Sequence, residues 1–162
     1  LNSITVVGHH DYRLELAKNR GATKIINSKN EEKMKSILFN ETKNKGFDIV
    51  VEYAGSTNAM ALAASVTKPK CRSQLVLASA YSNDTPFIIS NYLQNRAPII
   101  VPAYPHQSKN KILDLERSIW TIQNINYKDL ITHEYDFKNI FNCFDDQSNK
   151  KNNFIKGIFL PI

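Results

Sequence analysis

Short apolar segments alternate with segments of helical periodicity along most of this chain, and this alternation limits the possible folds more than any other feature. The apolar segments are rich in β-branched residues, as buried strands are, and they are Ile4–Val7, Lys24–Asn27, Phe47–Glu52, Leu75–Ala78 and Ile99–Val101. The helical segments are Tyr12–Arg20, Glu31–Asn40, Asn58–Val66 and a long helix after Ser108. Strands that alternate with helices of about ten residues are typical of a parallel sheet, so the sequence predicts an α/β fold.

Local signals refine two of these helices. Asp11 precedes the first helix and is predicted to cap its N-terminus. Four residues of the long helix recur at helical spacing and are predicted to form its apolar face, namely Ile112, Leu115, Ile119 and Ile122. Trp120, on the same helix, and Cys143, between Phe141 and Phe144, are both expected in a core.

The alternating pattern changes after about Asn126. Leu130–Asp136 is predicted to be extended, Asn139–Asp146 to be a short helix and Phe154–Leu160 to be a final strand. We therefore divide the chain into residues 1–128, which carry the alternating elements, and residues 129–162, which follow a different pattern.

Composition and charge exclude several classes of protein. Hydrophobic residues make up 42% of the chain, enough for an ordinary core, and the apolar runs are too short to span a bilayer. The net charge of +6 comes from scattered lysines without interleaved aromatic residues, which disfavours a nucleic-acid surface. Cys71 and Cys143 match no metal-binding or redox spacing. These features indicate a cytoplasmic protein with reduced cysteines and with neither a nucleic-acid nor a membrane partner.

Several strings of residues occur in the order and at the spacings found in one enzyme family. They are Val6–Ala22, Thr23–Lys29, Gly46–Ser56, Leu130–Tyr135 and Phe154–Gly157. Four of them resemble the R-L-x-L-A-K-x-x-G-A, G-x-D-x-V-x-E-x-x-G-S, L-I-T-H-x-F and I-K-G elements of the medium-chain dehydrogenase/reductase family. The last two are similar to the ending of its zinc-type alcohol and polyol dehydrogenases.

This resemblance implies a partial Rossmann fold, a doubly wound parallel sheet that lacks its first strand and the G-x-G-x-x-G turn. No G-x-G-x-x-G occurs among the five glycines of the chain. The resemblance makes residues 1–128 part of an NAD(P)-binding domain and residues 129–162 a return segment of the catalytic domain.

The parent enzyme implied by the resemblance transfers a hydride between an alcohol or polyol substrate and a nicotinamide cofactor. Zinc would be held by a domain of the parent outside this chain, so we expect no catalytic residue and no metal ligand here. The chain alone is expected to be inactive. A homo-oligomer stays open, because Ile99–Val101 lies where family members often pair edge to edge.

The first group of candidate cofactor-binding residues follows the first two strands, and it consists of Gly8, His9, His10, Arg13 and Ser28. In NAD-specific Rossmann domains an acidic residue at the end of the second strand binds the adenosine ribose, and Gly8 occupies that position by the resemblance. The two histidines, Arg13 and Ser28 can instead donate hydrogen bonds to a 2′-phosphate. We therefore place NADP ahead of NAD, although the histidines could equally be ordinary exposed loop residues.

The second group follows the third, fourth and fifth strands, and it consists of Ala54, Gly55, Ser56, Ala78, Ser79, Ala80 and Ala103. Ligands of open α/β sheets bind at the carboxyl ends of the strands. Small residues there would let the backbone approach the ribose and nicotinamide of the cofactor. The simpler interpretation of Ala54–Ser56 is a tight turn before a helix N-cap, and both can hold together.

Other interpretations remain open at this stage. His106 and His133 have no Cys or Glu at ligand spacing, which favours a structural role for both. The chain could be a non-catalytic nucleotide-binding or oligomerisation module. Within the same family it could be part of a zinc-free quinone or enoyl reductase. A different Rossmann enzyme, such as a methyltransferase, would need a glycine-rich loop and an acidic ribose ligand that are not evident here.

Overall fold

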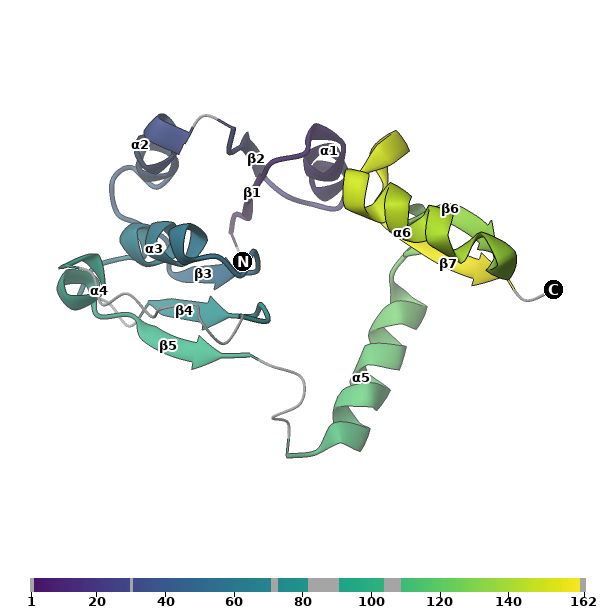
Figure 1. Cartoon of the computed structure of the whole chain (residues 1–162). Coiled ribbons are helices and arrows are strands. Elements are labelled where there is room, and N and C mark those ends of the chain that lie inside the picture. The colour runs from purple at the N-terminus through teal and green to yellow at the C-terminus, as the bar shows by residue number, and fades with distance from the viewer. Residues whose placement is uncertain (1, 30, 71–72, 82–90, 104–108, 161–162) are drawn as a thin grey trace. The chain divides into compact units, whose positions relative to one another are not determined.

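The computed structural model describes residues 2–29, 31–70, 73–81, 91–103 and 109–160 (Figure 1). The chain divides into two compact units, one made of Leu1–Lys29 with Ile112–Ile162 and the other of Asn30–Lys111. All strands that pair within each unit are parallel, which confirms the predicted α/β class. In the described part of the chain no helix has the length and apolar character needed to cross a bilayer.

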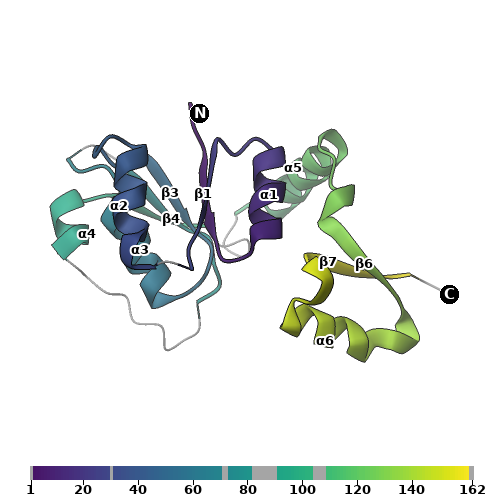
Figure 2. The same ribbon diagram turned by 90° about the horizontal axis from the view of Figure 1, so that it is seen from above.

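The first unit begins with a β–α–β motif. The strands β1 (Thr5–Gly8) and β2 (Lys24–Asn27) pair in parallel, and α1 (Asp11–Asn19) connects them and lies alongside β1 in Figure 2. Leu14 of α1 and Ile26 of β2 are buried and give the motif its apolar contact. The register pairs Gly8 with Asn27. The next residue of each strand therefore also lies close to its counterpart, which brings His9 beside Ser28.

The remainder of this unit comes from the C-terminal part of the chain. It contains α5 (Lys111–Asn124), β6 (Ile131–Asp136), α6 (Ile140–Asn149) and β7 (Lys156–Leu160), with 3-10 turns at Lys128–Leu130, Phe137–Asn139 and Lys151–Asn153. The strands β6 and β7 pair in parallel, and α6 belongs to the segment that connects them. Cys143 of α6 and Phe154 before β7 are buried at the centre of this part.

The second unit is a three-stranded sheet with its connecting helices. Its elements are α2 (Glu31–Glu41), β3 (Ile49–Glu52), α3 (Thr57–Val66), β4 (Gln74–Leu77), α4 (Asn91–Arg96) and β5 (Ile99–Pro102). The strand order is β3-β4-β5. Ala63 and Ala64 of α3 pack on Leu75 of β4, with Val50 and Leu77 at the edge of this cluster. Because the three strands are parallel, their carboxyl ends lie at one edge of the sheet.

The structure corrects several details of the sequence interpretation. Asp11 is the first residue of α1 rather than its cap, because its carboxylate accepts a hydrogen bond from Asn27 Nδ2 at 2.5 Å and the N-cap position falls on His10. The strand predicted from Phe47 begins at Ile49, since Phe47 makes only an isolated bridge to Thr67. The short helix α4 was not predicted, because Asn91–Arg96 is too short to show helical periodicity.

The long helix contradicts the prediction that Trp120 lies in a core. All four residues of its apolar face, Ile112, Leu115, Ile119 and Ile122, are exposed, and so is Trp120. Cys143 is buried as predicted, whereas Phe141 and Phe144 beside it are exposed. Ser108, His106 and Cys71 lie outside the residues that the structure describes.

Candidate functional site

The carboxyl ends of β1 and β2 bring together two residues of the first candidate group. His9 Nδ1 and Ser28 Oγ lie 2.7 Å apart, within hydrogen-bonding distance. Ser28 is buried, and its backbone N–H donates to the carbonyl of Gly8 at 2.8 Å. Parallel pairing therefore places a hydroxyl and an imidazole side by side where the two strands end. Either group can donate a hydrogen bond to an anionic ligand.

The surroundings of His10 are cationic. Partial burial lowers the pKa of His10, and the nearby positive charges of Arg13, His9, Lys150 and Lys29 lower it further. A dianion bound beside these groups would favour the imidazolium form and reverse this effect. Lys150 belongs to the C-terminal part of the same unit and was not among the residues predicted from the sequence.

Arg13 is already engaged by the protein. Its guanidinium donates to the carbonyl of Phe154 at 3.0 Å, and Tyr12 Oη donates to the same carbonyl at 2.9 Å. The Arg13 Nε is buried without a hydrogen-bond partner among the described residues. Arg13 thus fastens α1 to the segment before β7, and its charge adds to the positive potential around His10.

Gly8 leaves the end of β1 without a side chain. A Cβ placed there would lie 3.3 Å from Leu14 Cδ2, so Leu14 would have to yield slightly to any substitution. The position therefore carries no acidic group that could repel a phosphate, and α1 packs closely against it.

In the second unit, two turns after β3 and β4 are in direct contact. Gly55 has φ +73°, and a Cβ at this residue would lie 2.5 Å from Ser79 Oγ and 3.1 Å from the Ala80 carbonyl. Only glycine satisfies both the backbone conformation and this close approach. The need for glycine thus arises from contact between the two turns themselves.

The other residues of the second group surround these turns. Ser56 Oγ caps α3 by accepting a hydrogen bond from the Ala59 N–H at 3.2 Å, so the N-cap interpretation is confirmed. The N–H groups of Ala78 and Ala103 extend the strand pairing by donating to the carbonyls of Glu52 and Leu77, each at 2.9 Å. A cavity of about 280 Å³ opens at this edge, and its lining residues are Leu77, Ser79, Ala80, Tyr81 and Pro102.

Glu52 and Tyr81 are two residues of this edge that the sequence interpretation missed. Glu52 is only 3% exposed, and its carboxylate accepts hydrogen bonds from the Ala54 and Gly55 N–H groups and from Tyr81 Oη. Burial, followed by the hydrogen bond to Glu52 and its charge, raises the pKa of Tyr81. An acidic residue at the end of an otherwise apolar strand was the available signal, because a buried carboxylate requires partners.

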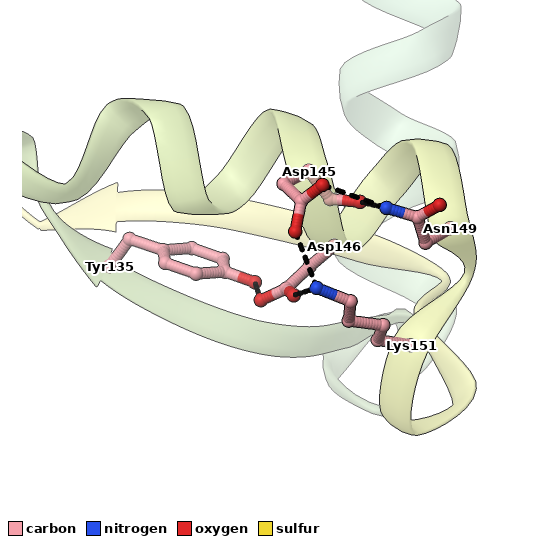
Figure 3. Close-up of polar contacts among 5 residues, drawn as sticks. All are labelled: Tyr135, Asp145, Asp146, Asn149 and Lys151. Carbon is pink, nitrogen blue, oxygen red and sulfur yellow. Dashed lines mark hydrogen bonds and ion pairs between the residues drawn. The ribbon is translucent and has the colours of Figure 1, made fainter.

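A separate polar network fastens α6 to β6 (Figure 3). Tyr135 Oη donates to Asp146 Oδ2 at 2.8 Å, Lys151 pairs with Asp145, and Asn149 Nδ2 donates to Asp145 Oδ1 at 2.7 Å. Burial, then the hydrogen bond and charge of Asp146, raise the pKa of Tyr135 to about 12. All members of this network satisfy one another, so its role is structural.

The raised pKa of Tyr135 predicts that the folded chain loses stability at alkaline pH. The pKa of Tyr135 is raised above the value of about 10 expected in the unfolded chain, so its contribution is complete below pH 10 and disappears as the pH rises to about 12. In Tyr135→Phe the unfolding free energy should decline less steeply over this range than in the wild type, as measured by urea denaturation at each pH. Tyr53→Phe, at a tyrosine that is 77% exposed, is the matched control. If the unfolding free energy declines equally with pH in the wild type and in Tyr135→Phe, the stabilising role of the Tyr135–Asp146 hydrogen bond is wrong.

His133 has a packing role. Its ring stacks on Phe154 with centroids 4.9 Å apart, and its Nδ1 lies 2.8 Å from Thr132 Oγ1. Over the described ranges of the chain, no group of three or more His, Cys, Asp or Glu side chains converges as metal ligands would. The described residues therefore do not fit a zinc ion.

Comparison with known proteins adds the family to this geometry. A family model described as zinc-binding dehydrogenase matches residues 2–115. The zinc-type alcohol dehydrogenase-like protein YdjJ of Escherichia coli K12 is 26% identical over 161 residues, which cover 96% of this chain and 42% of YdjJ. The chain thus spans less than half of this relative.

Solved structures share the fold. An alcohol dehydrogenase zinc-binding domain protein from Burkholderia ambifaria superimposes with a TM-score of 0.80 at 21% identity, covering 99% of this chain and 42% of that one. Benzyl alcohol dehydrogenase from Acinetobacter calcoaceticus gives a TM-score of 0.73 at 21% identity, covering 98% and 42%. These superpositions confirm the predicted Rossmann-like α/β fold.

Proposed function

Because the chain belongs to the zinc-binding dehydrogenase family, we propose that it is the cofactor-binding part of an NAD(P)-dependent alcohol or polyol dehydrogenase. The observation that carries this proposal is the His9–Ser28 pair at the carboxyl ends of two parallel strands, where open α/β sheets bind their ligands. In this proposal residues 1–128 form the cofactor-binding part and residues 129–162 the return segment. The sheet formed by β6 and β7 lies wholly within residues 129–162, although the compact unit that contains it also includes residues 1–29.

The adenosine end of the cofactor lies against the first group of residues in this proposal. Ser28 Oγ and His9 donate hydrogen bonds to a phosphate on the ribose, and His10 adds a positive charge when it is protonated. Arg13 and Lys29 strengthen the positive potential there. The absence of an acidic side chain at Gly8 favours NADP over NAD, because a carboxylate would repel the 2′-phosphate.

The nicotinamide end lies against the second group. The backbones of Ala54–Ser56, Ala78–Ala80 and Ala103 form its wall, and their small side chains leave room for a ribose and a ring. A nicotinamide held there would supply the chemistry of hydride exchange with the substrate. The residues of this chain bind and orient the cofactor, and we assign the zinc ligands and the substrate contacts to other residues of the parent enzyme.

A pair of adenosine fragments tests the proposal without the complete enzyme. Adenosine 2′,5′-bisphosphate should bind the chain about tenfold to hundredfold more tightly than adenosine 5′-monophosphate, because charge-assisted hydrogen bonds to the second phosphate are added. Binding of the bisphosphate should raise the pKa of His10, since a dianion stabilises the imidazolium form.

The affinities are measured by calorimetric titration, and the pKa of His10 by the NMR shifts of its ring protons between pH 5 and 8. Ser28→Ala should abolish most of the difference between the two fragments, whereas Ser36→Ala, at an exposed serine of α2, is the control. Equal affinities for the two fragments would exclude the preference for NADP. Binding of neither would refute the adenosine site.

A further inference from the structure

The buried carboxylate of Glu52 is unusual for a strand of this sheet. Glu52 ends β3, its exposed fraction is 3%, and its register partner in β4 is the apolar Leu77. Removing a carboxylate from water costs free energy unless hydrogen bonds replace the lost hydration. The chain retains this group at the edge of the sheet where the proposed cofactor would bind.

The hydrogen bonds of Glu52 join two turns that are far apart in the sequence. Oε1 accepts from two successive backbone N–H groups, those of Ala54 at 2.7 Å and Gly55 at 3.0 Å. Oε2 accepts from Tyr81 Oη, which follows β4 and lies 29 residues away. One carboxylate therefore holds the turn after β3 with one oxygen and the segment after β4 with the other.

Steric contact reinforces this link. Gly55 lies so close to Ser79 and Ala80 that a single added carbon would clash with both. If Glu52 were removed, the backbone N–H groups of Ala54 and Gly55 would lose their acceptor, and Tyr81 would lose its partner at the wall of the adjacent cavity. The two turns would then be free to separate.

We propose that Glu52 is a positioning residue, which acts through Tyr81 to hold the turns Ala54–Ser56 and Ser79–Tyr81 in the single arrangement that accepts the cofactor. This inference rests on the proposed function. Glu52 itself contacts no cofactor in this proposal, and it acts only through the backbone of one turn and the side chain of the other.

Three substitutions at Glu52 and Tyr81 distinguish the effect of the hydrogen bonds of Glu52 from the effect of its negative charge. In Glu52→Gln the amide oxygen can still accept both N–H groups, and the amide nitrogen can donate to Tyr81 Oη, so the link is preserved without the charge. In Glu52→Ala every bond is lost. In Tyr81→Phe only the link to the second turn is lost.

The affinity for NADPH of the full chain, measured by the fluorescence of the reduced nicotinamide, tests the proposal. We expect Glu52→Ala to weaken binding about tenfold to hundredfold, Tyr81→Phe about tenfold, and Glu52→Gln less than about threefold. The double variant Glu52→Ala/Tyr81→Phe should bind no more weakly than Glu52→Ala alone, since both changes break one link.

Thr67→Val is the matched control for loss of a buried hydrogen bond. Thr67 is fully buried, its hydroxyl donates to the Ala64 carbonyl at 2.9 Å, and it follows α3 at the opposite end of the sheet, beside Phe47. The Thr67→Val substitution should lower the melting temperature of the chain without changing its affinity for NADPH. If Glu52→Gln weakens binding as much as Glu52→Ala, or if the effects of Glu52→Ala and Tyr81→Phe add, the positioning role is wrong.

Amide hydrogen exchange provides a readout that needs no cofactor. Tyr81→Phe should accelerate exchange at the Ala54 and Gly55 N–H groups, although it removes neither of their own bonds. Unchanged exchange would overturn the link between the turns. If the wild type fails to bind NADPH, the proposed function fails, whereas the exchange experiment still decides whether Glu52 joins the turns.

Discussion

Gly8→Asp should reverse the cofactor preference of the chain. A carboxylate at the end of β1 would lie next to the proposed position of the 2′-phosphate and would repel it, while it could accept hydrogen bonds from the free ribose hydroxyls of NADH. We expect the affinity for NADPH to fall about hundredfold, which corresponds to about 2.7 kcal/mol, and the affinity for NADH to rise. Titration of the variant with each reduced cofactor measures both effects.

Gly8→Ala separates charge from steric hindrance in this experiment. Its Cβ meets Leu14 at the same 3.3 Å as the Cβ of the aspartate would, but it carries no charge. We expect Gly8→Ala to reduce the affinities for NADPH and NADH equally. A loss of NADPH binding in Gly8→Ala as large as that in Gly8→Asp would contradict the electrostatic explanation.

Gly55→Ala is expected to have the largest effect on stability. The left-handed backbone at φ +73° costs a non-glycine residue about 1–2 kcal/mol. Contact with Ser79 and the Ala80 carbonyl adds about 1–3 kcal/mol for overpacking, so the unfolding free energy should fall by about 2–5 kcal/mol. Because the two turns are forced apart, NADPH binding should be lost as well.

Two further variants separate the backbone strain at Gly55 from the steric contact between the two turns. Gly21 also has a positive φ, of +102°, but a Cβ there meets nothing within 4 Å, so Gly21→Ala reports backbone strain alone. Combining Gly55→Ala with Ser79→Ala removes the closest clash and should recover part of the stability. Urea denaturation measures each variant, and equal losses in Gly55→Ala and Gly21→Ala would show that the contact between the turns is unimportant.

Much of the fold could be predicted from local sequence patterns. The strands are short and apolar, and parallel pairing follows from the helices between them, so the proximity of His9 and Ser28 was predictable from where their strands end. The helix α4 escaped prediction because six residues are fewer than two helical turns and show no clear period.

Contacts between distant residues could not be predicted in the same way. The bond between Glu52 and Tyr81 depends on how the segment after β4 returns toward β3, and no local pattern encodes that path. The attachment of Arg13 to the Phe154 carbonyl spans 141 residues. A guanidinium predicted from sequence as a phosphate ligand is thus partly occupied by the protein itself.

The most direct test of the central proposal is titration of the chain with NADPH and NADH, followed by the fluorescence of the reduced nicotinamide. We expect saturable binding of both cofactors, with NADPH about tenfold tighter and dissociation constants of about 10 µM to 1 mM, because no G-x-G-x-x-G turn is present among the glycines of the chain to hold the pyrophosphate. Absence of saturable binding by either cofactor at about 1 mM would contradict the assignment of these residues to a nicotinamide cofactor.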